Sequence, residues 1–77
     1  MKIEILGTGC SKCEALFNNA KLAVGKAGKF AQIEKVEDLQ KIMEYGVMST
    51  PGLVINGEVK STGKVLSADE IVALLNA

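Results

Sequence analysis

The sequence predicts an α/β fold in which a four-stranded mixed sheet carries helices on both of its faces. Apolar residues recur at strand and helix spacing in the order βαβαββα. The opening strand–helix–strand unit predicts a parallel pair with a right-handed crossover, and the closing hairpin adds two antiparallel strands. The chain has 77 residues, of which 48% are hydrophobic, so we expect one small domain over residues 1–77.

The first strand and the first helix follow each other directly. Residues 2–6 form an apolar run that predicts a buried strand, and a short turn leads to a helical pattern over about residues 11–27. Gly28 is expected to end this helix, because glycine tolerates the left-handed conformation that closes many helices. Apolar residues recur on one face of the helix: Leu16, Ala20, Ala23, Val24 and Ala27.

A second strand and a short helix are predicted next. Imperfect apolar alternation indicates a strand over about residues 30–36. Its apolar residues are Phe30, Ile33 and Val36. Asp38 is a suitable N-cap for a helix that ends at Tyr45–Gly46. The apolar residues of this helix are Leu39, Ile42 and Met43. We expect Met43 and Met48 to fill gaps in the core and groove, and Tyr45 to serve packing rather than catalysis.

The second half of the chain predicts a hairpin followed by a helix. An apolar run at residues 53–55 is joined to residues 58–62 by Asn56–Gly57, a pair in which both residues tolerate positive φ. Gly63 then breaks the strand. Residues 67–70 read Ser-Ala-Asp-Glu, a capping box that opens the last helix. The inward-facing residues of this helix are Ala68, Ile71, Val72 and Leu75.

Two cysteines at the start of the first predicted helix carry the chemistry of the chain. Cys10 and Cys13 are its only cysteines, and it has no histidine. Their spacing places two thiols on one helix face, close enough to join as a disulfide. Free N–H groups and the positive end of the helix dipole favour a thiolate at Cys10, and the charge of Lys12 adds a modest contribution. We therefore expect Cys10 to be the exposed nucleophile and Cys13 the buried resolving thiol.

A structural disulfide is the main alternative for this pair. Closing so short a loop restrains the unfolded chain by only about 2 kcal/mol, against about 4.7 kcal/mol for a loop of about 100 residues. The sequence lacks the long apolar stretch of a signal peptide, so we expect a cytoplasmic protein. In that compartment, a lone Cys-x-x-Cys is more often a redox or metal site than a structural link.

Composition excludes several classes of partner. Nine basic and nine acidic residues balance, so there is no basic face that would predict nucleic-acid binding. No apolar run reaches the roughly 20 residues that cross a bilayer, so no membrane association is expected. No long apolar stripe is left over once the helices are docked, and we therefore expect a monomer.

Taken together, these features resemble the thioredoxin fold in its minimal, glutaredoxin-sized form. The resemblance rests on the Cys-x-x-Cys after the first strand, Thr50–Pro51 before the third strand, the Asn56–Gly57 hairpin and Gly63. It covers essentially the whole chain and is strongest to the small redox-active disulfide proteins of bacteria and archaea. It implies strand order 2-1-3-4 and a thiol–disulfide oxidoreductase without a cofactor beyond the Cys10–Cys13 disulfide. Its implied partners are disulfide-containing protein substrates and a thioredoxin-reductase-type or other electron donor.

The same resemblance assigns further residues to the site. It implies that Pro51 is cis and lies against the active disulfide, and that Thr50 offers its backbone to an extended substrate, with Gly63 in the same groove. Thioredoxins usually carry an aromatic residue before the first cysteine, where this chain has Gly9. They also bury an acid below the second cysteine. No residue matches that acid clearly, although Glu4 is on the corresponding strand.

Two other functions would use the same residues. Small metallochaperones also place Cys-x-x-Cys after a first strand, and two thiolates can hold copper(I). Their fold is βαββαβ and ends on a strand, whereas this chain is predicted to end on a helix, so copper binding is the second interpretation. Zinc needs four ligands, of which this motif supplies two, and no metal ligand is assigned. The third interpretation is a peptide-binding module that keeps the groove without turnover.

Overall fold

The computed structural model describes residues 1–9 and 11–76, which fold in the predicted order βαβαββα. The elements are β1 (Lys2–Leu6), α1 (Ser11–Ala27), β2 (Gln32–Val36), α2 (Leu39–Glu44), β3 (Gly52–Ile55), β4 (Glu58–Thr62) and α3 (Ala68–Leu75). The predicted and observed bounds agree closely, and the clearest difference is at β2, which begins at Gln32 rather than Phe30. Within the described ranges, no helix has both the length and the apolar character that crossing a membrane requires.

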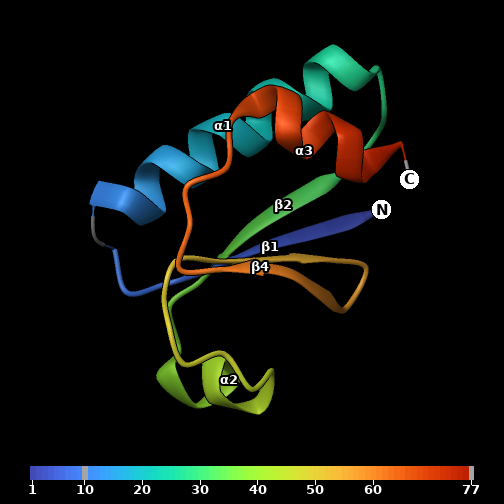
Figure 1. Ribbon diagram of the computed structural model, residues 1–77. Coiled ribbons are helices and arrows are strands. Elements are labelled where there is room, and N and C mark those ends of the chain that lie inside the picture. The colour runs from blue at the N-terminus through green and yellow to red at the C-terminus, as the bar shows by residue number, and fades with distance from the viewer. Residues whose placement is uncertain (10, 77) are drawn as a thin grey trace.

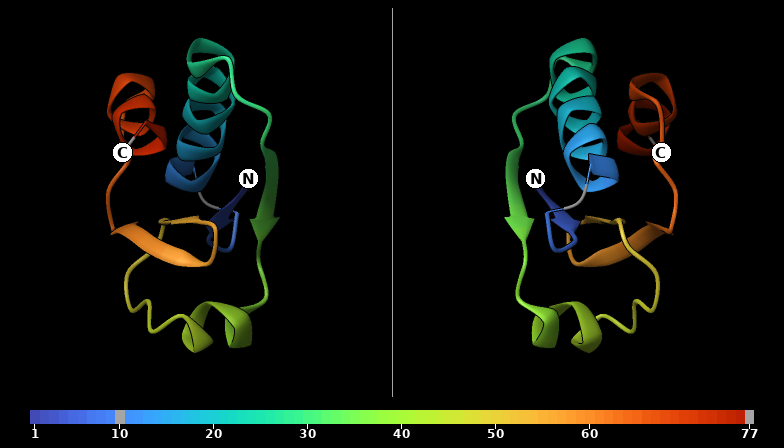
Figure 2. Two further views of the ribbon diagram at one scale, coloured as in Figure 1. Left: turned by 90° about the vertical axis from the view of Figure 1, so that its right-hand side faces the viewer. Right: turned by 90° about the vertical axis from the view of Figure 1, so that its left-hand side faces the viewer.

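The strands of the described residues form one mixed sheet in the order β2-β1-β3-β4, which confirms the predicted order. β1 pairs in parallel with β2 and antiparallel with β3, and β3 pairs antiparallel with β4. Figure 1 shows α1 and α3 on one face of this sheet and α2 on the other. The two views in Figure 2 show the same layers, with α1 and α3 side by side. Helices therefore cover both faces, as the sequence predicts.

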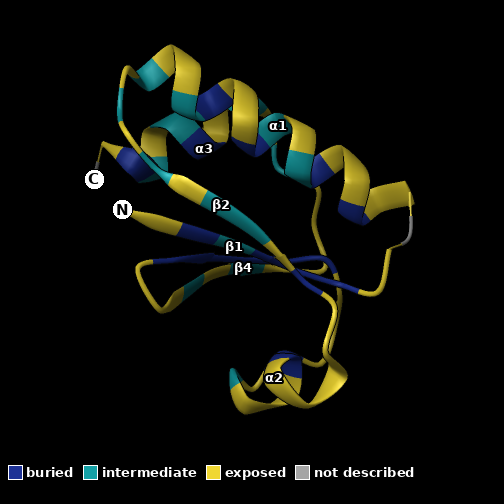
Figure 3. Cartoon of the chain, turned by 180° about the vertical axis from the view of Figure 1, so that it is seen from behind, coloured by how far each residue is buried: buried dark blue, intermediate teal, exposed yellow. Residues whose placement is uncertain are grey.

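Alternation along the strands divides the core between the two faces of the sheet. In β1, Ile3 and Ile5 pack with residues of α1 and α3, whereas Leu6 packs with the α2 side. The larger cluster consists of Ile3, Ile5, Leu16, Ala20, Ala23, Leu53, Ile55, Ile71 and Leu75. The smaller cluster consists of Leu6, Val36, Ile42, Val47 and Val54. β3 contributes to both clusters and is buried along its whole length. Figure 3 shows that the outer strand β2 is instead mostly intermediate or exposed.

Caps and turns form where the sequence predicts them. The Asp38 carboxylate accepts a hydrogen bond from the Gln40 N–H at 3.0 Å. Ser67 and Glu70 form a capping box, in which each side chain accepts a hydrogen bond from the backbone N–H of the other residue. The Asn56–Gly57 turn has φ values of 52° and 81°, which are in the left-handed region that this pair favours. These local signals fix the starts of α2, β4 and α3.

Several apolar residues are exposed, which corrects their predicted packing. Phe30 precedes β2 and is fully exposed, because the strand begins only after it. Leu39 and Met43 are 60% and 68% exposed, since the six-residue α2 turns only Ile42 into the core. Met48 is 96% exposed and fills neither the core nor a groove. Hydrophobic character alone did not determine which face of a short element meets the sheet.

Candidate active site

Cys13 is held in the first turn of α1 and is buried. It lies two residues after Ser11, where α1 begins, and is only 6% exposed. Helical spacing explains this burial, because Cys13 is on the same face as the buried residues Leu16 and Ala20. Lys12 is exposed beside it. Cys10, the predicted nucleophile, lies outside the described residues, so the geometry of the site is built from Cys13.

The sulfur of Cys13 lies against the backbone of Gly7, at the end of β1. A Cβ atom added to Gly7 would lie closer than 3.0 Å to Sγ of Cys13 and 3.2 Å from its Cβ. The same added atom would be 3.9 Å from Cβ of Thr50. The Gly7 N–H donates to the Val36 carbonyl at 3.0 Å and so continues the β1–β2 pairing past the strand end. Cys13 and Thr50, in the loop before β3, therefore both lie close to Gly7.

The second part of the candidate site is the Thr50–Pro51 segment of the loop before β3. The peptide bond between them is cis, as the resemblance implies. Pro51 is fully buried, whereas Thr50 is exposed. Gly63 supports the loop from β4: its N–H donates to the Pro51 carbonyl at 2.8 Å, and its φ is 70°. A Cβ on Gly63 would come within 3.2 Å of Cβ of Ser49. The fold thus gathers four predicted site residues, Cys13, Thr50, Pro51 and Gly63, at one end of the sheet.

One carboxylate beside this site was not identified from the sequence. A Cβ atom added to Gly9 would lie 3.7 Å from Oε2 of Glu37, so the acid reaches the residue that precedes Cys10. Glu37 directly follows β2, and residues 7–9 directly follow β1. Because β1 and β2 are parallel neighbours, the segments after their carboxyl ends meet at the same edge of the sheet. The parallel pairing was the signal that could have pointed to Glu37.

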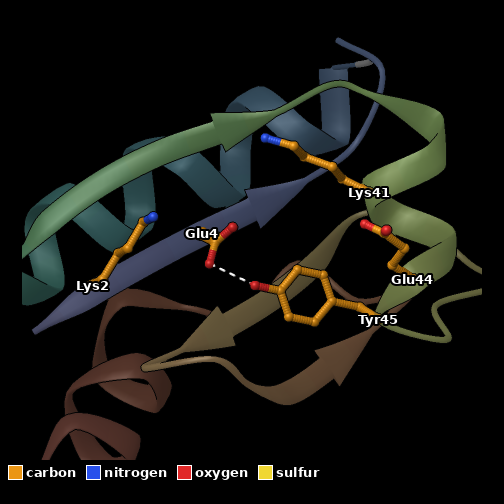
Figure 4. Close-up of a pocket in the computed structure, with 5 residues that line it drawn as sticks. All are labelled: Lys2, Glu4, Lys41, Glu44 and Tyr45. Atoms are coloured by element: carbon orange, nitrogen blue, oxygen red, sulfur yellow. Dashed lines mark hydrogen bonds between the residues drawn. The ribbon is translucent and has the colours of Figure 1, made fainter.

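Glu4 belongs to a different site, on the α2 face of the sheet. It alternates with Ile3 and Ile5 and accepts a 2.7 Å hydrogen bond from the hydroxyl of Tyr45, the C-cap of α2. Figure 4 shows this pair in an open pocket that Lys2, Lys41 and Glu44 also line. The hydrogen bond to Glu4, with smaller contributions from desolvation and nearby acids, raises the pKa of Tyr45 above 10.0. Glu4 therefore ties α2 to β1 and faces away from the helix that carries Cys13.

Metal-ligand residues do not gather elsewhere in the part of the chain that the structure describes. Over residues 1–9 and 11–76, no group of three or more histidine, cysteine, aspartate or glutamate side chains is arranged to hold a metal ion. Cys10 lies outside these residues.

Comparison with known proteins identifies a family and several relatives. A family model described as a thioredoxin domain matches residues 1–76. A thioredoxin from Methanothermobacter thermautotrophicus is 43% identical over 76 residues, which cover 99% of this chain and 99% of that protein. Two thioredoxins from Methanocaldococcus jannaschii are 42% and 33% identical and cover 90% and 82% of this chain. The chain spans 79% of each of these two proteins. The similarity thus includes both the segment around Cys13 and the loop at Pro51.

Proposed function

The chain belongs to the thioredoxin family, and on this premise we propose that it is a thiol–disulfide oxidoreductase that reduces disulfide bonds in proteins. The observation that carries the proposal is that the buried Cys13 sulfur and Thr50, beside the cis Pro51, both lie close to Gly7. A structural cysteine would need only an apolar environment. Here Gly7 is a shared neighbour of the sulfur and of Thr50, an exposed residue of the loop before β3.

The proposed reaction has two exchange steps. The Cys10 thiolate attacks one sulfur of a substrate disulfide, so a Cys10–substrate disulfide forms and the first substrate thiolate leaves. Cys13 then loses its proton and attacks the Cys10 sulfur. The Cys10–Cys13 disulfide forms, and the second substrate thiolate leaves and is protonated. Two electrons pass from the protein to the substrate. The protons that Cys10 and Cys13 give up to water equal the two that the substrate thiolates take up. An external dithiol or reductase must then restore the two thiols.

The groove residues have separate roles in this proposal. Thr50 is exposed and offers its backbone to an extended substrate segment, which would bind by adding a short strand. Pro51 is buried and holds that segment of the loop near Cys13. Gly63 supports the loop through its hydrogen bond to the Pro51 carbonyl. Lys12 is assigned a modest electrostatic contribution to the thiolate of Cys10.

Replacing Cys13 by serine tests the exchange reaction directly. The Cys13→Ser variant should stop after the first step and accumulate a mixed disulfide with a protein substrate such as insulin, which gel electrophoresis without reductant detects. The Cys10→Ser variant, whose remaining thiol is buried, should trap far less. Wild-type protein should release reduced insulin when dithiothreitol supplies electrons. Equal trapping by both variants, or loss of copper(I) binding without any trapping, would contradict the proposal.

A further inference from the structure

Gly7 is distinguished from the other turn glycines by what surrounds it. Gly9 and Gly63 have φ values of 84° and 70°, so their backbone conformation favours glycine by itself. Gly7 is not among the described residues with positive φ, and its backbone would accept an alanine. What excludes a side chain there is the sulfur of Cys13, which would lie closer than 3.0 Å to an added Cβ. Position 7 therefore favours glycine because Sγ of Cys13 leaves no room for a side chain.

Resting on the function proposed above, we propose that Gly7 is a positioning residue for the resolving step. Its missing side chain leaves the space in which Sγ of Cys13 lies, and Thr50 is the next residue that an atom in that space would approach. The Gly7 backbone cannot withdraw easily, because its N–H is bound to the Val36 carbonyl. The fully buried Pro51 and its hydrogen bond to Gly63 hold the loop on the other side.

A methyl group at Gly7 would therefore displace the sulfur rather than its surroundings. Rotation about χ1 of Cys13 moves Sγ to another rotamer, and it leaves Cβ of Cys13 still 3.2 Å from the added atom. Translation of α1 is opposed by Leu16 and Ala20, which are fully buried in the larger core cluster. The smallest adjustment moves Sγ of Cys13 away from its position beside the loop.

Such a displacement acts on one chemical step. In the resolving step, Sγ of Cys13 must approach the Cys10 sulfur in line with the bond to the substrate, as the Cys10–Cys13 bond forms and the substrate thiolate leaves. A misplacement of about 1 Å can slow a reaction on the order of 100-fold. The first attack by Cys10 does not involve the sulfur of Cys13 and should keep its rate. Gly7→Ala should therefore separate the two steps.

The test uses one equivalent of the aromatic disulfide dithiobis(nitrobenzoate), which releases a coloured thiolate at each step. Wild-type protein should release the first thiolate by attack of Cys10 and the second by attack of Cys13. In Gly7→Ala the first phase should be unchanged and the second about 100-fold slower. Gly25→Ala is the matched control, because an added Cβ there meets nothing within 4 Å, and both of its phases should equal those of wild type. If the second phase of Gly7→Ala were as fast as that of the wild-type protein, the role of Gly7 would be overturned. If the wild-type protein itself released no second thiolate, the proposed function would be overturned.

A stability cycle checks the packing without relying on activity. Gly7→Ala should lower the urea midpoint of the reduced protein when Cys13 is present. It should lower the midpoint less in the Cys13→Ala background, because the sulfur that meets the added methyl group is gone. Equal losses in both backgrounds would show that Gly7 is required for another reason and would overturn the inference. This readout also applies if Gly7→Ala alone folds poorly.

Discussion

Two side chains of opposite charge lie near the start of α1, and we expect them to act in opposite directions on the proposed nucleophile, Cys10. Lys12 is exposed in the first turn of the helix, and Oε2 of Glu37 reaches toward Gly9, the residue before Cys10. A cation stabilises a nearby thiolate and an anion destabilises it. Both side chains are exposed, so water screens each contribution to at most about 1 kcal/mol. We therefore expect these charges to adjust the reactivity of a thiolate at Cys10 only modestly.

Substitution of these charges should change the alkylation rate of Cys10 in opposite directions. In a Cys13→Ser background, where only Cys10 remains, Lys12→Gln should slow reaction with iodoacetamide at about pH 7, and Glu37→Gln should speed it. Each change should be no more than about fivefold, which corresponds to about 1 kcal/mol. Lys26→Gln, at the far end of α1, removes the same charge as Lys12→Gln and should have no effect. Changes of the same sign in both variants would contradict this electrostatic account.

Local capping decides where elements of this small fold begin, and α3 is the clearest example. The Ser67 hydroxyl accepts from the Glu70 N–H at 3.2 Å, and the Glu70 carboxylate accepts from the Ser67 N–H at 3.1 Å. Ser67→Ala should lower the free energy of unfolding by about 1 kcal/mol, as measured by urea titration. Ser67→Asn keeps an oxygen that can cap the helix and should retain most of the stability. A loss as large in the asparagine variant would exclude capping as the cause.

The contact between α2 and β1 predicts a pH dependence at the alkaline end. The Tyr45 pKa is raised above 10.0 in the folded protein, mainly by the hydrogen bond to Glu4, so folding favours the neutral phenol. Its stabilising contribution is fully present below pH 10.0 and is lost as the pH rises through the higher pKa of the folded state. Tyr45→Phe should therefore lose less stability than wild type when urea titrations below and above pH 10.0 are compared. Both proteins carry the same lysines, so lysine titration affects them equally. If the free energy of unfolding fell with pH equally in both proteins, this assignment would be contradicted.

Secondary structure was predictable because it depends on short-range signals, whereas the strand order followed from the family resemblance. The Asp38 cap, the Asn56–Gly57 turn and the Ser67 capping box act within a few residues of themselves. Phe30 and Met48 were predicted to pack but are exposed. The sequence of a short segment does not show which of its apolar residues become buried. In a longer amphipathic helix such as α1, apolar residues that repeat at helical spacing do show which face is buried.

The site was predictable in part, for a similar reason. The burial of Cys13 follows from helical spacing, and the place of Thr50–Pro51 follows from the family resemblance. The roles of Gly7 and Glu37 depend on contacts between segments that are distant in sequence. No local pattern distinguishes a glycine required by a neighbouring sulfur from one required by a turn. Three-dimensional packing was needed to identify both residues.

At the scale of the whole molecule, the site lies at the end of the sheet away from the chain termini. Figure 1 shows the start of α1 on one side of the molecule and the labelled N and C ends on the other. The two core clusters hold helices on both faces of the sheet, and the end of β1, the start of α1 and the loop before β3 lie close together. A substrate could therefore approach the Thr50–Pro51 loop without contacting the termini.

Equilibrium redox titration of Cys10 and Cys13 tests the central claim most directly. The protein is equilibrated in buffers of reduced and oxidised dithiothreitol or glutathione, quenched with acid, alkylated and analysed by mass spectrometry. The account predicts one reversible two-electron transition between a dithiol and an intramolecular disulfide. Its potential should lie between about −270 and about −120 mV, the range of known Cys-x-x-Cys oxidoreductases. Two thiols that react independently, with glutathione adducts and no intramolecular disulfide at any potential, would contradict it.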